Sequence, residues 1–147
     1  MQLNPAPGVL TNIGLAAVKP RLLLADDHAE LLREVSELLG YEFDVVATVQ
    51  DGAALLLRAA ELLPDVVVTD LRMPHLSGIE AGRRLLDRKL CRAVVLLTLY
   101  DDSQFVRSAW DAGIHGYVTK ARAEIDLIPA IWAALGGKTF VSCAVGA

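Results

Sequence analysis

Five polar residues of this chain each end or directly follow a short apolar run: Asp26, Asp27, Asp70, Thr98 and Lys120. A carboxylate can act as the nucleophile toward a phosphoryl group, and further carboxylates can hold a metal ion. A lysine and a hydroxyl can bind the charged oxygens of the group in transfer. Each of these roles has a candidate here, provided that the fold brings the five side chains together.

Taken singly, each of these residues has a simpler explanation. An Asp-Asp pair after a strand is often a helix N-cap with a solvated neighbour. Thr98 alone fits a strand or turn, and Lys120 alone fits a solvated surface charge. However, four of the five apolar runs end in a residue type that one reaction needs. This coincidence favours a phosphoryl-transfer site over the separate explanations.

The apolar runs predict five strands, each buried on both faces. They are Leu22–Ala25, Val45–Val49, Val66–Thr69, Val94–Leu97 and Tyr117–Thr119. Stretches with helical spacing of apolar residues lie between and after the strands, from the stripe at Leu31–Leu39 to the last one at Ile125–Leu135. Pro129 predicts a late start or a kink in that last helix, because proline removes a backbone hydrogen bond.

Strict alternation of strands and helices predicts a (βα)5 architecture of the α/β class. Such strands pair in parallel through right-handed crossovers, which gives a doubly wound, five-stranded parallel sheet with helices on both faces. Sheets of this kind bind ligands at the carboxyl ends of their strands, where the five polar residues stand.

The three aspartates predict a magnesium site. If the strands before Asp26 and Asp70 are neighbours, the carboxylates converge, and their repulsion is costly unless a hard cation neutralises it. Mg²⁺ takes one or two carboxylates together with water and phosphate oxygens, so Asp70 could still present an oxygen to a phosphoryl group.

Composition excludes several other classes of protein. The 147 residues are 54% hydrophobic and carry a net charge of −4, which indicates one globular domain. No basic cluster is present to bind nucleic acid, and no apolar run approaches the 18 or so residues of a membrane span. Cys91 and Cys143 lack metal-finger or redox spacing. We expect a soluble, cytoplasmic protein, with residues 1–19 as a mobile extension before a domain at 20–137.

Four segments of the chain resemble the receiver domains of two-component response regulators, in the NarL/FixJ branch. The segments are Leu24-Ala25-Asp26-Asp27-His28, Asp70-Leu71-Arg72-Met73-Pro74, Leu97-Thr98-Leu99-Tyr100-Asp101-Asp102 and Ala112-Gly113-Ile114-His115-Gly116-Tyr117-Val118-Thr119-Lys120. Their order and spacing both agree with that family over residues 21–137.

The resemblance implies a flavodoxin-like receiver fold with strand order 2-1-3-4-5. It also implies that Asp70 accepts a phosphoryl group from a sensor histidine kinase, with self-catalysed transfer and dephosphorylation. Asp26, Asp27, Asp70 and the Met73 backbone carbonyl would hold Mg²⁺, and Thr98 and Lys120 would bind the phosphoryl oxygens. Thr98 and Tyr117 would form the conformational switch. The apolar stripe of the last helix suggests a homodimer as a further hypothesis.

Two departures from the family pattern stand out. Ala121 follows Lys120 where the family commonly has proline. Receivers of this branch also continue into a DNA-binding domain, whereas residues 138–147 resemble only a tail or the start of a linker. The sequence is therefore compatible with two alternatives, a single-domain receiver or a receiver cut from a longer transcription regulator whose DNA-binding domain is absent from this chain.

Three other functions fit the sequence less well than a phosphorylated switch. A magnesium-dependent aspartyl phosphohydrolase of the haloacid dehalogenase type would want an acid two residues after Asp70, where Arg72 stands. A phosphorylation-independent scaffold receiver would have lost some site residues, and none is lost. A dinucleotide-binding module would need a Gly-x-Gly-x-x-Gly loop after the first strand, which the sequence lacks.

Overall fold

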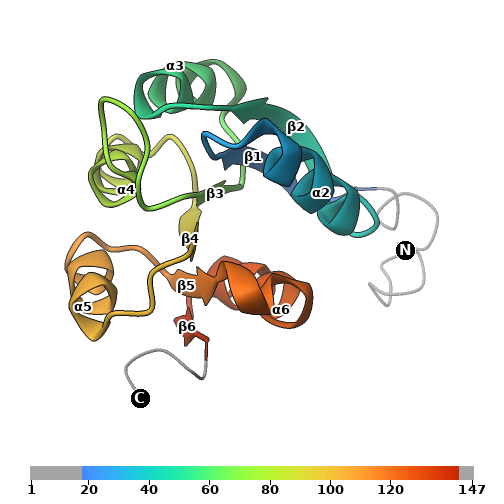
Figure 1. Ribbon diagram of the computed structural model, residues 1–147. Coiled ribbons are helices and arrows are strands. Elements are labelled where there is room, and N and C mark those ends of the chain that lie inside the picture. Colours follow the sequence, from blue (N-terminus) through green and yellow to red (C-terminus); the bar gives the residue numbers. More distant parts are fainter. Residues whose placement is uncertain (1–17, 143–147) are drawn as a thin grey trace, which may run out of the picture.

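The computed structural model describes residues 18–142. Their six strands form one sheet with the order β2-β1-β3-β4-β5-β6 (Figure 1). Every neighbouring pair of strands is parallel. The strands are β1 (Arg21–Ala25), β2 (Asp44–Val49), β3 (Val66–Thr69), β4 (Ala93–Thr98), β5 (Gly116–Thr119) and β6 (Phe140–Val141). The α/β class, the doubly wound topology and the predicted order of the first five strands are confirmed.

Helices cover both faces of the sheet, and a separate hydrophobic core lies between each face and its helices. They are α2 (Ala29–Leu39), α3 (Gly52–Leu62), α4 (Gly78–Asp87), α5 (Ser103–Asp111) and α6 (Ala123–Leu135), with the 3-10 turn η2 (Lys120–Arg122) before α6. Apolar side chains of α2 and α6 pack on one face, and those of α3, α4 and α5 pack on the other. Successive strand residues such as Leu22 and Leu23 alternate between these two cores.

The central strands β3 and β4 are buried along their whole length, and each is apolar except for its final threonine. This burial fixes where the carboxyl ends of the strands lie. All four residues of β3 and all six of β4 are buried. A one-residue slip of such a strand would move each side chain into the opposite core, where the facing helices are built for a different residue. The polar residues that follow the strands are therefore held at one edge of the sheet.

The sixth strand was not among the five predicted ones. β6 pairs with β5 through Gly116 with Phe140 and Tyr117 with Val141. Two residues are too few to show a periodicity of either kind, so the apolar pattern contains no signal for this strand. It lies in the segment that the sequence suggested as a tail or linker.

Of the two alternatives predicted for Pro129, a late start or a kink of the last helix, the late start is wrong. α6 begins at Ala123 and runs through Pro129. Pro129 is exposed, and Ile125, whose carbonyl loses its helical hydrogen-bond donor, is 65% exposed. Water can therefore reach the carbonyl that proline leaves without a partner, which reduces the cost of proline at this position.

Some expectations fall wholly or partly outside the described part of the chain. The extension predicted for residues 1–19 lies there except for Val18 and Lys19, and so does Cys143. Within residues 18–142, no helix has both the length and the hydropathy that crossing a bilayer requires.

Candidate functional site

Asp26 and Asp70 lie side by side because the strands before them, β1 and β3, are neighbours in the sheet. Ala25 pairs with Thr69, so the residues that follow them, Asp26 and Asp70, emerge side by side. The Asp70 amide donates to the Ala25 carbonyl at 2.9 Å, which continues the ladder by one step. Asp26 is 3% exposed and Asp70 is 7% exposed. The fold thus places two carboxylates together in a largely water-excluded position.

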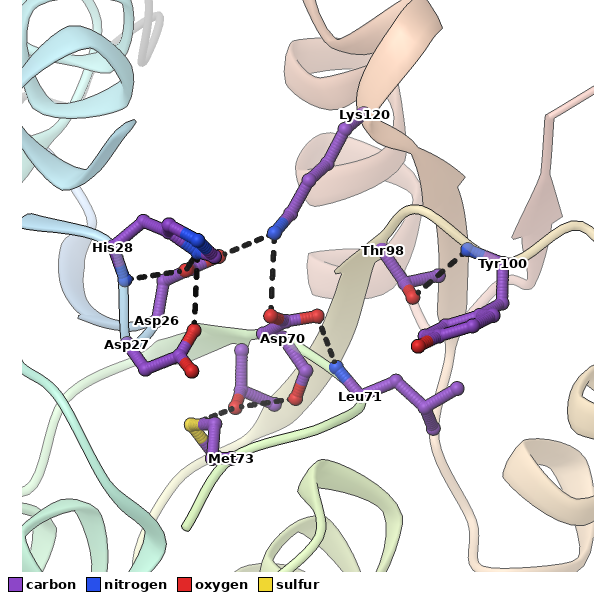
Figure 2. Close-up of polar contacts among 10 residues, drawn as sticks. Asp26, Asp27, His28, Asp70, Leu71, Met73, Thr98, Tyr100 and Lys120 are labelled. Atoms are coloured by element: carbon purple, nitrogen blue, oxygen red, sulfur yellow. Dashed lines mark hydrogen bonds and ion pairs between the residues drawn. The ribbon is translucent and has the colours of Figure 1, made fainter. Parts of the chain in front are cut away.

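Lys120 reaches these acids from the end of β5, and Figure 2 shows its ammonium group between the two carboxylates. Its Nζ lies 2.8 Å from Asp26 Oδ2 and 3.2 Å from Asp70 Oδ2. The lysine side chain is only 10% exposed. Three of the predicted site residues, from three different strands, are therefore in direct contact.

The Asp70 carboxylate is held at both oxygens. The Leu71 backbone amide donates to Oδ1 at 2.7 Å, and Lys120 donates to Oδ2 at 3.2 Å. The Thr69 hydroxyl donates to the Asp70 backbone carbonyl at 3.0 Å and, more weakly, to the Met73 thioether at 3.7 Å. These contacts orient the acid and tie it to the loop that carries Met73.

The charges at this site do not balance. Burial raises the pKa of Asp70, and the charge of Asp26 raises it further against the opposing effect of Lys120. Burial alone would lower the pKa of Lys120, but its hydrogen bond to Asp26 and the charge of Asp70 outweigh burial and raise it. The ammonium therefore stays charged, and one cation faces an excess of negative charge.

Asp27 and His28 extend the acidic group toward solvent. His28 Nδ1 lies 3.3 Å from Asp26 Oδ1 and 3.1 Å from Asp27 Oδ1, and the His28 amide donates to Asp26 at 2.9 Å. His28 itself is the N-cap of α2, and its side chain makes no capping bond. The simpler explanation of the aspartate pair as a helix cap is therefore wrong.

The acidic group fits a hard divalent cation. Ligand atoms of Asp26, Asp27 and His28 all lie within 4.8 Å of one another. Carboxylate oxygens are the donors that Mg²⁺ prefers, and a bound cation would relieve the excess negative charge that raises the pKa of Asp70. The donor set of this chain is thus suited to magnesium.

Thr98 and Tyr117 are joined to each other through Tyr100. The Tyr100 amide donates to the Thr98 hydroxyl at 3.2 Å, and the Tyr117 hydroxyl donates to the Tyr100 carbonyl at 2.6 Å (Figure 2 shows the first of these bonds). Among the contacts described for residues 18–142, no hydrogen bond joins Thr98 or Tyr117 to the acids. Tyr117 is fully buried, and burial together with Asp102 and Asp101 raises its pKa to about 12, so the hydroxyl remains a donor.

Two residues of this site had no assigned role in the sequence analysis. His28 directly follows the aspartate pair, and this adjacency was a usable signal. Tyr100 contributes through its backbone, to which Thr98 and Tyr117 both bond. A backbone role leaves no mark on residue type, so the sequence contains no signal for it.

Comparison with known proteins gives a consistent result. The family model of the response regulator receiver domain matches residues 22–131. The transcriptional regulatory protein PdtaR of Mycobacterium tuberculosis is 34% identical over 117 residues, which cover 79% of this chain and 57% of PdtaR. The oxygen regulatory protein NreC of Staphylococcus epidermidis is 32% identical over 124 residues, covering 82% of this chain and 57% of NreC. The chain thus spans little more than half the length of these relatives.

Solved structures agree with the sequence relatives. A two-component response regulator of the LuxR family from Aurantimonas sp. SI85-9A1 superposes with a TM-score of 0.81 at 31% identity, covering 87% of this chain and 93% of that one. The isolated receiver domain of RcsB from Salmonella enterica serovar Typhimurium, determined with the phosphomimetic BeF3⁻, gives a TM-score of 0.78 at 27% identity, with 87% and 96% covered. On its motifs, its fold and the family match over residues 22–131, this chain belongs to the response regulator receiver domain family.

Proposed function

We propose that the chain accepts a phosphoryl group on Asp70 from a phosphorylated histidine of a sensor kinase and thereby switches conformation. The observation that carries this proposal is the contact of Lys120 Nζ with both Asp26 and Asp70, at 2.8 and 3.2 Å, in a site that retains excess negative charge. Membership of the receiver family supports it.

In the transfer step, a carboxylate oxygen of Asp70 forms a bond to phosphorus. The phosphorus–nitrogen bond to the donor histidine breaks, and its electron pair returns to the imidazole. Mg²⁺ held by Asp26, Asp27, Asp70 and the Met73 backbone carbonyl would offset charge on the phosphoryl oxygens. Lys120 exchanges a carboxylate partner for a phosphoryl oxygen, and the Leu71 amide keeps the carboxylate oriented.

The switch follows from the bonds around Tyr100. When the Thr98 hydroxyl turns to a phosphoryl oxygen, it gives up its bond to the Tyr100 amide. The Tyr100 carbonyl holds the Tyr117 hydroxyl, so the displacement reaches β5 and the face formed by α5, β5 and α6. A phosphoryl group can bias the two conformations only through such differential contacts.

The output partners are part of the proposal. We place the protein in the cytoplasm, where histidine kinases present their phosphohistidine. A second copy of the chain is proposed to pack on α6, where Trp132 is 47% exposed and Ile125 is 65% exposed. Control of transcription would act through a DNA-binding domain that residues 18–142 do not contain.

The two other candidate functions are less well supported. Arg72, at the position where a phosphohydrolase would carry its second acid, stacks on the Tyr100 ring with its guanidinium carbon 5.0 Å from the ring centroid. A phosphorylation-independent scaffold has no need for the Asp26–Lys120–Asp70 contacts, and they are intact.

Asp70→Asn is expected to abolish incorporation of phosphate from acetyl phosphate, because the amide is a poor nucleophile and binds metal weakly. The measurement is intact-mass spectrometry of the wild type and the variant with magnesium, and of the wild type with EDTA. Asp87→Asn, which changes an exposed acid at the end of α4, is the matched control and should be modified like the wild type. Equal modification of Asp70→Asn and wild type would overturn the proposal.

Asp27→Ala is expected to weaken magnesium binding by about tenfold or more, as for loss of a group that holds or orients a metal. Without metal the variant should be at least as stable as the wild type, because the excess negative charge near Asp26 falls. Calorimetric titration with Mg²⁺ and thermal unfolding in EDTA measure the two effects. Unchanged affinity in Asp27→Ala, relative to an Asp87→Ala control, would remove Asp27 from the proposed site.

A further inference from the structure

The short strand β6 docks the end of the described chain on the edge of β5. The Phe140 amide donates to the His115 carbonyl and the Ser142 amide donates to the Tyr117 carbonyl, both at 2.9 Å. Ser142, which follows the strand, is 1% exposed. A polar residue buried to this degree next to a two-residue strand needs partners for its hydroxyl.

The Ser142 hydroxyl has two polar neighbours. It accepts a hydrogen bond from the Thr119 amide at 3.1 Å. It also lies near the carboxylate of Asp126. Asp126 in turn accepts from Arg122 Nε at 2.7 Å, and this bond, with the nearby Ser142 hydroxyl, holds the pKa of Asp126 below its usual range. The Ser142 hydroxyl thus belongs to one buried polar network with Thr119, Asp126 and Arg122.

This network contacts the chain both before and after Lys120. Thr119 immediately precedes Lys120, and Arg122 is the last residue of η2, the 3-10 turn that begins at Lys120. Ser142 is hydrogen-bonded to Thr119, and its hydroxyl lies near Asp126, the carboxylate that binds Arg122. Contacts of Ser142, the last residue described, therefore help to fix the backbone that directs Lys120 toward Asp26 and Asp70.

A second connection runs through Tyr117. Its carbonyl accepts from the Ser142 amide, while its hydroxyl donates to the Tyr100 carbonyl. The Tyr100 amide donates to Thr98. The segment Phe140–Ser142 therefore bonds to Thr119, which precedes Lys120, and to Tyr117, which connects through Tyr100 to Thr98. Lys120 and Thr98 are the two side chains that would bind the phosphoryl oxygens.

We infer that Ser142 is a positioning residue for Lys120, and that docking of Phe140–Ser142 on β5 is coupled to phosphoryl binding at Asp70. The inference rests on the proposed function and adds to it the element that receives the signal. Coupling between two sites is reciprocal: if docked Ser142 favours binding at Asp70, then binding at Asp70 strengthens the docking of Ser142 by the same factor.

The first test uses the unaltered chain. Amide hydrogen exchange is measured with Mg²⁺ alone and with Mg²⁺ plus BeF3⁻. Exchange of the Phe140 and Ser142 amides should slow by about fivefold or more with BeF3⁻, the lower end of typical coupling between sites. The Leu63 amide, which donates to Ala59 at the end of α3, is the internal control and should not change.

The second test removes the hydroxyl. Ser142→Ala should weaken BeF3⁻ binding in the presence of Mg²⁺, and slow modification by acetyl phosphate, by about fivefold or more. Ser142→Thr, which keeps a hydroxyl, should restore both. Val141→Thr alters the preceding residue, which lies on β6 and is 41% exposed, and should behave as wild type. A purely structural serine would lower the unfolding temperature without changing the BeF3⁻ affinity of the folded protein.

The outcomes separate this inference from the proposed function. If the wild type binds no BeF3⁻ with Mg²⁺, both are overturned. If it binds BeF3⁻ but the Phe140 and Ser142 amides exchange at unchanged rates, the inference alone is wrong. The same holds if folded Ser142→Ala binds BeF3⁻ as tightly as the wild type. If Ser142→Ala does not fold, the exchange rates of the wild-type amides decide.

Discussion

Replacing Lys120 with methionine is expected to destabilise the metal-free protein by about 3 kcal/mol, the cost typical of removing one partner from a buried ion pair. Methionine keeps most of the volume of the lysine chain but leaves Asp26 and Asp70 without their shared cation. Their side chains are only 5% and 9% exposed, so water cannot replace the ammonium group well. The midpoint of thermal unfolding in EDTA should fall by about 10 °C.

The same substitution should make stability more dependent on magnesium. A divalent cation at the acids compensates for part of the lost positive charge, so the gap between Lys120→Met and wild type should narrow in excess Mg²⁺. Lys138→Met removes an exposed lysine and controls for the change in net charge. An unfolding midpoint in EDTA that is equal for Lys120→Met and Lys138→Met would show that the two ion pairs contribute nothing.

Gly78→Ala should also lower stability by about 3 kcal/mol, near the upper end of the usual cost of overpacking. A Cβ atom at position 78 would lie 1.9 Å from the Asp70 carbonyl oxygen and 2.9 Å from its carbonyl carbon. Both atoms are backbone, so neither can rotate away. The start of α4 or the loop after β3 must shift, and either movement displaces Asp70 itself.

Urea unfolding and the rate of modification by acetyl phosphate measure the two consequences of Gly78→Ala. Gly136→Ala is the matched control, because a Cβ there meets nothing nearer than the Ala133 carbonyl oxygen at 3.5 Å. The control should stay within about 0.5 kcal/mol of the wild type, as most exposed substitutions do. If Gly78→Ala is as stable and as reactive as Gly136→Ala, the close packing of α4 on Asp70 has no functional importance.

The parts of the fold that the sequence predicts are those whose residues repeat a pattern. All five predicted strands lie within one residue of the observed ends, because runs such as Val66–Thr69 are apolar except for a final threonine and are followed by a charged residue. Parallel pairing then brings the strand ends to one edge, and the contact of Asp70 with Lys120 follows from it. The convergence of these side chains needed only strand positions and the parallel topology.

The parts that the sequence did not predict depend on single bonds rather than on periodicity. Tyr100 links Thr98 to Tyr117 through its own amide and carbonyl, which every residue type except proline possesses. β6 is held by two backbone bonds and by the Ser142 hydroxyl, and a single serine in a short tail has no distinctive spacing. Such features become visible only when the neighbouring backbone is in place.

Whether Asp70 is the phosphoacceptor can be decided by locating the modified residue in the wild-type chain. After reaction with acetyl phosphate and Mg²⁺, borohydride reduces an aspartyl phosphate to homoserine, and peptide sequencing by mass spectrometry finds its position. We expect homoserine at position 70 alone, and none when EDTA replaces magnesium. Homoserine at Asp26, Asp27 or another acid, or unmodified Asp70 in the presence of magnesium, would contradict this expectation.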